Sequence, residues 1–144
     1  MILPLRQTIF STEIIKSIIK PYGKLHFLED IFVLEVNYLV NFVWDHQADV
    51  IEDLEQFYGD SLHRVVYISN RVYHFDCNPL IWVKLKNLNL RIKGIAIVSD
   101  LHCNKLQKVV ESLFLPVNVL YYDCMINAFQ WAATMNQSAF LEVI

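Results

Sequence analysis

The residue types best suited to chemistry gather in one polar segment that follows an apolar run at residues 64–68. That run is typical of a buried central strand, so the segment is expected at the carboxyl end of the strand, where open α/β sheets bind ligands. Arg71 could hold a carboxylate or phosphate through its fork of donors, oriented by Asn70, or could instead pair with an internal carboxylate such as Asp76. The candidate loop for a ligand or partner consists of Ser69, Asn70, Arg71, His74 and Asp76.

Metal and nucleophile chemistry can also be drawn from this segment. His74, Asp76 and Cys77, with His102 and Cys103 further along, are side chains that zinc accepts, but their spacing matches no metal motif. A Cys-His pair lacks any mark of an oxyanion hole or of a third orienting group. The chain contains no GxGxxG, GxxxxGK[ST], GxSxG or HExxH motif. We therefore predict no catalytic residue, no cofactor and no metal site.

Composition narrows the classes of partner. Apolar residues make up 55% of the 144 residues and charged residues 19%, against about 45–50% and about 25% in ordinary soluble domains. The excess predicts either a large core or an apolar surface for a partner. The formal net charge of −3 gives no broad attraction to a polyanion, so we expect no nucleic-acid binding.

The sequence predicts a cytoplasmic protein with reduced thiols. No apolar stretch approaches the roughly 18 residues of a membrane-spanning helix, and the first residues lack the pattern of a signal peptide. Cys77, Cys103 and Cys124 are odd in number and show no CxxC spacing, which favours free thiols over a disulfide framework.

The elements that position these residues begin with a predicted β-hairpin. Its strands are residues 24–28 and 31–36, joined by a turn at Glu29-Asp30. The preceding segment, Ile14 to Ile19, suits a helix or a strand, and its spacing favours a helix. A helix is predicted from Asp45, as N-cap, to Tyr58, ending at Gly59. Its acidic side could face a partner or only solvent, and comprises Asp49, Glu52, Asp53 and Glu55.

The second half alternates between strands and helices. Asn78-Pro79 predicts a helix start that continues through Leu80, Val83 and Leu88. Strands are predicted at 94–98 and 117–121. Helices are predicted from Asp100, carrying Leu106, Val109, Val110 and Leu113, and from Asp123 to Trp131. The order predicts a single α/β domain over 1–144, with a sheet that is largely parallel after the hairpin and covered by helices.

Several blocks of the sequence resemble a known family. They are Tyr67-Ile68-Ser69-Asn70-Arg71-Val72, then Asp76, Pro79 and Trp82, then Gly94-Ile95-Ala96-Ile97-Val98-Ser99, then Glu111, Leu113 and Phe114, and finally Ala128 and Trp131. Over residues 23–131 the chain resembles SpoIIAA-like proteins of the STAS group, in particular the version found in Bacteroidetes-type bacteria. This group is related to the CRAL-TRIO lipid-binding domains. The resemblance implies a STAS-like sheet.

The resemblance also directs attention to Ser69. STAS proteins that antagonise anti-sigma factors carry a phosphorylatable serine where a central strand meets the next helix, and Ser69 ends the corresponding strand. The Asp-Ser-Ser-Gly type of motif is missing, however, and the loop 70–78 is longer. The sequence therefore favours a structural role for Ser69, bonded to local backbone.

Three functions follow as expectations. The first is a non-enzymatic cytoplasmic regulatory or protein-interaction module of STAS-like fold, which binds a protein partner or a second copy of itself. The alternative is a small-molecule or lipid-binding domain, in which an apolar pocket between a helix and the sheet holds an acidic ligand whose head meets Arg71. The weakest is an enzyme using the loop from Arg71 to Asn78, which would need titratable groups that converge there.

Overall fold

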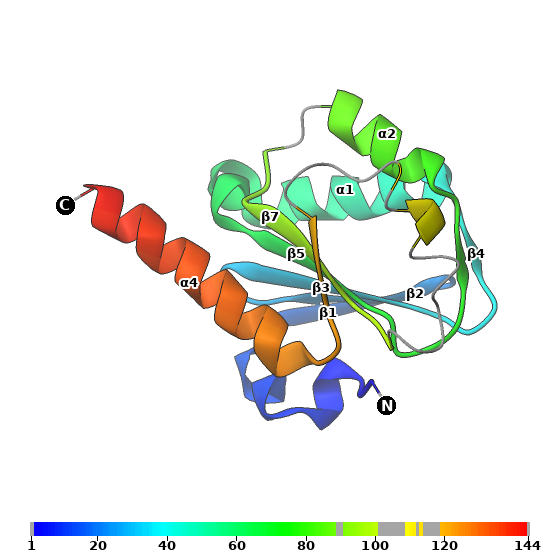
Figure 1. Cartoon of the computed structure of the whole chain (residues 1–144), viewed down its shortest axis with the longest axis horizontal. Coiled ribbons are helices and arrows are strands. Elements are labelled where there is room, and N and C mark those ends of the chain that lie inside the picture. Colours follow the sequence, from blue (N-terminus) through cyan, green and yellow to red (C-terminus); the bar gives the residue numbers. More distant parts are fainter. Residues whose placement is uncertain (1, 89–90, 101–108, 112, 114–118, 144) are drawn as a thin grey trace.

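In the computed structural model the chain folds around one mixed β-sheet (Figure 1). The structure describes residues 2–88, 91–100, 109–111, 113 and 119–143, with the side chains of the last helix up to Met135. Within these residues the sheet has six strands in the order β1-β2-β3-β5-β7-β8. The strands are β1 (Lys16–Lys20), β2 (Gly23–Phe27), β3 (Ile31–Val36), β5 (Val66–Asn70), β7 (Gly94–Val98) and β8 (Val119–Tyr122).

The sheet changes from antiparallel to parallel at β3. Strands β1, β2 and β3 pair in antiparallel fashion, whereas β3, β5, β7 and β8 pair in parallel. The predicted α/β fold, with an N-terminal hairpin followed by βα units, is confirmed. Strand β5 lies between β3 and β7 and all its residues are buried, which confirms the central strand predicted from its continuous apolar run.

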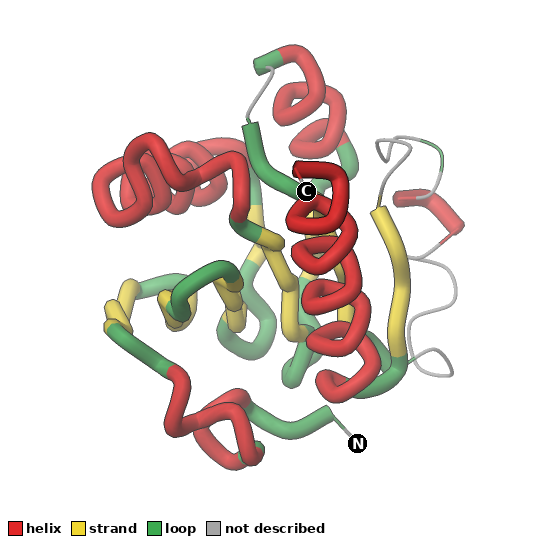
Figure 2. The backbone as a smooth tube through the Cα atoms, turned by 90° about the vertical axis from the view of Figure 1, so that its left-hand side faces the viewer, coloured by secondary structure: helices red, strands yellow, loops and turns green. Residues whose placement is uncertain are grey.

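Helices cover both faces of the sheet. The α-helices whose bounds lie within the described residues are α1 (Trp44–Tyr58), α2 (Leu80–Asn87) and α4 (Met125–Val143). The 3-10 helices there are η1 (Leu5–Gln7), η2 (Ile9–Glu13) and η3 (Gly59–Arg64). A small parallel pair, β4 (Asn41–Phe42) and β6 (Asp76–Cys77), lies apart from the main sheet. Helices α1 and α2 lie on one side of the sheet, while α4 and the N-terminal segment lie on the other (Figures 1 and 2).

This division of the helices follows from the strand order. Each crossover from β3 to β5 and from β5 to β7 moves the chain in the same direction across the sheet. Because parallel crossovers are almost always right-handed, successive crossovers in one direction place their helices on the same face. We call the face of the sheet that α1 and α2 cover the α1 face, and the face that α4 covers the α4 face.

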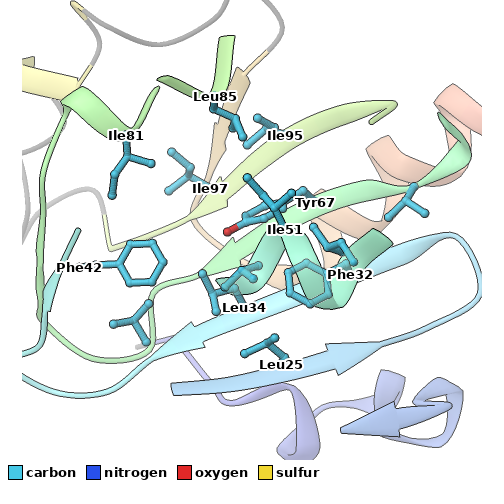
Figure 3. Packing of buried hydrophobic residues seen from close by; sticks show 14 of the residues in the cluster. Leu25, Phe32, Leu34, Phe42, Ile51, Tyr67, Ile81, Leu85, Ile95 and Ile97 are labelled. Carbon is cyan, nitrogen blue, oxygen red and sulfur yellow. The ribbon is translucent and has the colours of Figure 1, made fainter. Parts of the chain in front are cut away.

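Each face has its own apolar core, because side chains alternate along a strand. On the α1 face, Phe32, Leu34, Tyr67, Ile95 and Ile97 of the sheet pack with α1 and α2 (Figure 3). On the α4 face the core consists of Ile2, Leu5, Leu28, Val33, Val66, Ile68, Ala96, Val98, Met125, Ala128, Phe129 and Ala132. The N-terminal segment and α4 therefore share one core.

In the first half of the chain, the predicted hairpin and the predicted helix are both present, but the N-cap of the helix differs from the prediction. The hairpin is confirmed, with β2 beginning at Gly23. The helix predicted from Asp45 to Tyr58 is also confirmed, but its N-cap is Val43, so the Asp45 prediction was wrong. The cap works differently, since the Val43 backbone N–H donates to His46 Nδ1 at 3.1 Å.

The preference for a helix from Ile14 to Ile19 was wrong. Residues Lys16–Lys20 form strand β1, and the Ile15 N–H already donates to the Phe27 carbonyl at 2.8 Å. Helical spacing and strand alternation both fit a run of isoleucines, and here the partner strand decided between them. Pairing with β2 provides partners for the backbone groups of β1 that face β2, and an extended strand suits β-branched side chains.

The second half confirms the alternation of strands and helices. Helix α2 begins at Leu80 with Pro79 as its N-cap, so the prediction of Asn78 as the cap was wrong, although Asn78 Oδ1 accepts from the Leu80 N–H at 3.0 Å. The helix buries Ile81, Trp82 and Leu85, while Leu80 and Leu88 are exposed. The start of the helix predicted from Asp100, including Leu106, lies outside the described residues; residues 109–111 are helical. Helix α4 begins after Asp123 and continues past Trp131 to Val143.

Among the described residues, no helix is long and apolar enough to cross a membrane.

Candidate functional site

The structure divides the predicted loop between interior and surface. Ser69 and Asn70 belong to β5, Arg71 follows it, and all three side chains are buried. His74 and Asp76 are exposed, and Asp76 belongs to β6. The five candidate residues therefore do not converge on one surface. Ser69 pairs with Leu34 and Ile97 in the middle of the sheet, so a kinase has no access to its hydroxyl in the folded state.

Arg71 is held by an internal carboxylate, and that carboxylate is Glu111, not Asp76. Its Nη1 and Nη2 donate to Glu111 Oε1 at 2.5 Å and Oε2 at 2.9 Å, and Trp82 Nε1 donates to Oε2 at 2.7 Å. The Phe75 ring lies 5.4 Å from the guanidinium carbon. Burial lowers the pKa of Arg71, but the bonds and charge of Glu111 outweigh burial and raise it.

The cavity that described residues line beside this ion pair is small. The cavity beside Arg71, lined also by Cys77, Trp82 and Gln47, measures about 10 Å³, which is roughly the space for a single water molecule. Burial raises the pKa of the Cys77 thiol to about 12, and burial likewise raises that of Tyr121 to about 12. Titratable groups do converge here, as an enzyme would need, but they are packed against one another.

A second buried polar cluster, on the α4 face, was missed by the sequence analysis. His26 Nε2 donates to Glu35 Oε1 at 3.0 Å, and the Leu5 N–H donates to Glu35 Oε2 at 2.7 Å. Asn70 Nδ2 donates both to Glu35 Oε2 at 2.7 Å and to the Leu3 carbonyl at 3.0 Å. The available signal was a histidine and a glutamate at inward positions of a hairpin.

This cluster fastens the N-terminal segment to the sheet. Burial raises the pKa of Glu35, but the hydrogen bonds from His26, the Leu5 amide and Asn70 outweigh it and lower the pKa. Glu35 is thus a carboxylate, which can accept all three donors. Leu5 is itself fully buried, so the segment is held by both polar and apolar contacts.

The largest hollow beside this segment is an apolar groove between η1 and η2 on one side and α4 on the other, and we call it the groove. Its first compartment, about 290 Å³, is lined by Ile2, Leu3, Gln7, Thr8, Ile9, Phe10, Cys124, Met125 and Ile126. The second, about 720 Å³, is lined by Ile9, Phe10, Glu13, Ile15, Leu28, Glu29, Asp30, Ile31, Ile126, Phe129, Gln130 and Ala133. Three residues, Ile9, Phe10 and Ile126, border both compartments.

The walls of the groove expose large apolar side chains. Ile9 is 76% exposed, Ile15 62% and Ile126 50%. Between the compartments the rings of Phe10 and Phe129 stack with centroids 3.9 Å apart, which joins the N-terminal segment to α4. The sequence indicated an apolar excess but did not place it here.

Other predicted groups have structural partners. Lys20 Nζ lies 3.2 Å from an Asp49 oxygen and 2.9 Å from an Asp53 oxygen, so half of the acidic side of α1 contacts β1. Cys77 and Cys124 are free thiols. His102 and Cys103 lie outside the described residues, and within the described ones no three histidine, cysteine or acidic side chains are placed to bind a metal ion.

Comparisons with models of protein families, with curated proteins and with solved structures find no match to this chain. The function is therefore inferred from the groove and the buried clusters.

Proposed function

We propose that this protein is a non-enzymatic cytoplasmic regulatory or protein-interaction module of STAS-like fold that binds a segment of a protein partner in the groove. The observation that carries the proposal is the exposure of Ile9, Ile15 and Ile126 along one apolar groove. Monomeric proteins seldom leave large apolar side chains gathered in water unless a partner covers them. A small molecule bound inside the groove would leave the outward-facing parts of these isoleucine side chains exposed to solvent.

The buried clusters support a non-enzymatic role. The Nη1 and Nη2 atoms of Arg71 are occupied by the two carboxylate oxygens of Glu111, and the raised pKa keeps Cys77 a protonated thiol, which is a poor nucleophile and metal ligand. Glu35 is likewise occupied by donors from His26, Asn70 and the Leu5 amide. The reactive side chains of these two clusters are used to hold the fold together.

The arrangement of the sheet supports the STAS-like fold. An antiparallel N-terminal hairpin is followed by parallel βα units, which is the arrangement expected from the resemblance of residues 23–131. The proposed module is one domain over residues 1–144.

A second candidate function is the binding of an apolar small molecule or lipid, favoured by the first compartment. Its volume of about 290 Å³ lies at the lower end of the range for ligand pockets. Arg71 does not supply the head-group contact expected earlier, because it packs with Tyr67 and Trp82 on the α1 face while the groove lies on the α4 face.

Two matched variants test the proposal. Ile126→Ser removes an apolar side chain from the groove, and Leu80→Ser removes one of similar exposure, 50% against 54%, from the opposite face. A photo-crosslinking residue at Ile9 in each background, expressed in the native host, reports contact by mass spectrometry. We expect one protein crosslinked in the wild type and in Leu80→Ser and lost in Ile126→Ser.

Two outcomes would contradict the proposal. Equal crosslinking in Ile126→Ser and Leu80→Ser would show that the groove is not the contact surface. A monomer that retains a small apolar molecule in native mass spectrometry, with that mass lost in Ile126→Ser, would instead establish the second candidate.

A further inference from the structure

The two ends of the groove differ in charge. The first compartment is lined by residues that carry no charge, among them Leu3, Cys124 and Met125. The lining of the second compartment includes three carboxylates, those of Glu13, Glu29 and Asp30. No lysine, arginine or histidine is among the described residues that line either compartment. The groove is therefore apolar at one end and acidic at the other.

The acidic end is held rigidly. Glu29 and Asp30 form the turn between β2 and β3, and the Asp30 carbonyl accepts from the Val66 N–H at 2.9 Å. From the other face the Tyr58 hydroxyl bonds the carbonyls of Leu28 and Ile31, at 2.7 and 2.9 Å. Because the backbone of this turn is already fixed, only the exposed carboxylate side chains need to be ordered when a partner binds.

These carboxylates have no internal counter-charge within the described part of the chain. The ion pairs there involve Lys20 with Asp49 and Asp53, His26 with Glu35, and Arg71 with Glu111. Glu13 and Glu29 are exposed and Asp30 is partly exposed. Three negative charges beside an apolar surface raise the local preference for a cation.

We infer that the segment bound in the groove is apolar where it meets Met125 and carries lysine or arginine side chains where it meets Glu13, Glu29 and Asp30. This inference rests on the proposed function, since it names the chemistry of the partner at the same groove. Opposite charges on the groove and on the partner segment speed their association. They also determine which end of the segment lies beside the three carboxylates.

The same charges disfavour other occupants. A fatty acid or phospholipid bound in the groove would place its anionic head group beside three carboxylates. In the opposite orientation it would bury that anionic group at the uncharged end of the groove. A second copy of this chain could offer α2, which has Lys84 and Lys86 and an exposed Leu80. In that helix, however, the Lys84 ammonium already lies 5.6 Å from the centre of the Trp44 ring.

Two synthetic peptides test the inference. Both carry the same spacing of leucine and alanine and a fluorescent label, but one ends in lysines and the other in glutamates. Binding to the full chain is followed by fluorescence anisotropy. We expect the lysine peptide to bind at least about tenfold more tightly, with its affinity falling as salt is raised to about 0.5 M, where charges are screened over a few ångströms.

Charge reversal identifies the carboxylates. Glu29→Lys with Asp30→Lys should abolish or invert the preference for the lysine peptide. The control, Glu52→Lys with Glu55→Lys on the exposed side of α1, changes the net charge equally and should leave the preference intact. A loss of preference in both double variants would show that only net charge matters and would overturn the inference.

The remaining outcomes separate this inference from the proposed function. If neither peptide is preferred by the wild type, or neither binds, the inference about charge is overturned. The proposed function is tested separately by the crosslinking experiment at Ile9. It would be contradicted if the Ile126→Ser variant crosslinked its partner as well as the wild type does. If native mass spectrometry shows dimers or larger assemblies that Ile126→Ser dissociates, the occupant is a second copy, and the inferred basic partner is wrong.

Discussion

Arg71 and Glu111 form a bidentate ion pair that is almost completely removed from water. Desolvation of two charges costs several kcal/mol, and the mutual attraction repays it only when geometry and additional hydrogen bonds are good. Here Trp82 supplies such a bond to Glu111. The pair therefore does not need to add net stability, but breaking it leaves one charge buried without its partner.

Removing one partner of this pair should be costly. We expect Arg71→Ala to lower the free energy of unfolding by about 3–5 kcal/mol, as measured by urea titration. Replacing both residues, Arg71→Met with Glu111→Leu, should recover much of the loss, because no charge then remains buried. A loss below about 1 kcal/mol in Arg71→Ala would contradict a structural role and return Arg71 to consideration as a ligand contact.

Glu35 predicts a dependence of stability on pH. Its folded-state pKa is lowered below the ordinary 4.5, so it contributes stability above about 4.5 that is lost as pH falls through the folded-state pKa. We expect Glu35→Gln to be destabilised at neutral pH by about 1–3 kcal/mol and to approach the wild type in acid. Urea unfolding at several pH values measures the difference, and a constant gap would contradict the role of the carboxylate charge.

Sequence reasoning at this scale identified Arg71 but not its partner. Glu111 lies 40 positions away in the chain, and spacing along a sequence says nothing about which carboxylate a folded chain brings to a guanidinium. Asp76 was the nearer choice and is exposed. His26 and Glu35 were missed for a similar reason, since their roles depend on the Leu5 amide and on Asn70.

At the scale of elements, two glycines set how closely neighbouring elements approach each other: Gly23 where β2 meets β3, and Gly94 where β7 meets α4. A Cβ on Gly23 would collide with the Glu35 carbonyl oxygen of the neighbouring strand, and a Cβ on Gly94 would lie 2.9 Å from the edge of the Trp131 ring. The first neighbour is backbone in a paired sheet, and the second is a side chain of α4. Only the second can move without breaking a strand pairing.

Alanine at Gly23 should therefore lower the free energy of unfolding more than alanine at Gly94. We expect Gly23→Ala to cost at least as much as the upper part of the usual range for overpacking, about 1–3 kcal/mol, and Gly94→Ala to cost less. Thermal and urea unfolding of both variants measure the order. If Gly94→Ala proved the more damaging, α4 would be packed more rigidly on β7 than these contacts indicate.

Most elements were predictable because their patterns are local. The alternation of apolar strands and amphipathic helices, the helix start near Asn78-Pro79 and the stop at Gly59 all appear within a few residues. The segment from Ile14 to Ile19 was not predictable, because its strand form depends on pairing with β2. The cap at Val43 was missed because His46, three residues later, supplies the bond through its ring.

At the scale of the whole molecule, the two free thiols of the described chain occupy opposite surroundings. Both thiols are partly buried. Cys77 lies beside Arg71 on the α1 face, where burial raises the pKa of its thiol to about 12, whereas Cys124 lines the groove. Reaction of a thiol requires access and thiolate. Their reactivity therefore distinguishes the packed cluster from the open groove.

We expect iodoacetamide to label Cys124 readily and Cys77 only on unfolding. The measurement is mass spectrometry of labelled peptides in a Cys103→Ser background, so that only these two thiols are compared. A bulkier maleimide on Cys124 should also weaken partner crosslinking at the groove. Rapid labelling of Cys77 in the folded protein would show that the cluster around Arg71 opens to solvent.

The groove could not be found from the sequence, because its walls come from opposite ends of the chain. Residues Ile2 to Ile15 and Cys124 to Ala133 contribute apolar side chains that look, in each local pattern, like ordinary core residues. Both segments lie on the α4 face of the folded chain (Figure 2), and there Ile9, Ile15 and Ile126 remain exposed. The apolar excess in the composition was the one global signal.

The stacking of Phe10 on Phe129 has a consequence for synthesis on the ribosome. The first wall of the groove leaves the ribosome early, but the second wall is α4, which emerges only after the sheet has been translated. A partner that needs both walls cannot engage an incomplete chain. Binding would thus report that the sheet and α4 have both been translated and have folded together, and a product that stops before α4 would be left without its partner.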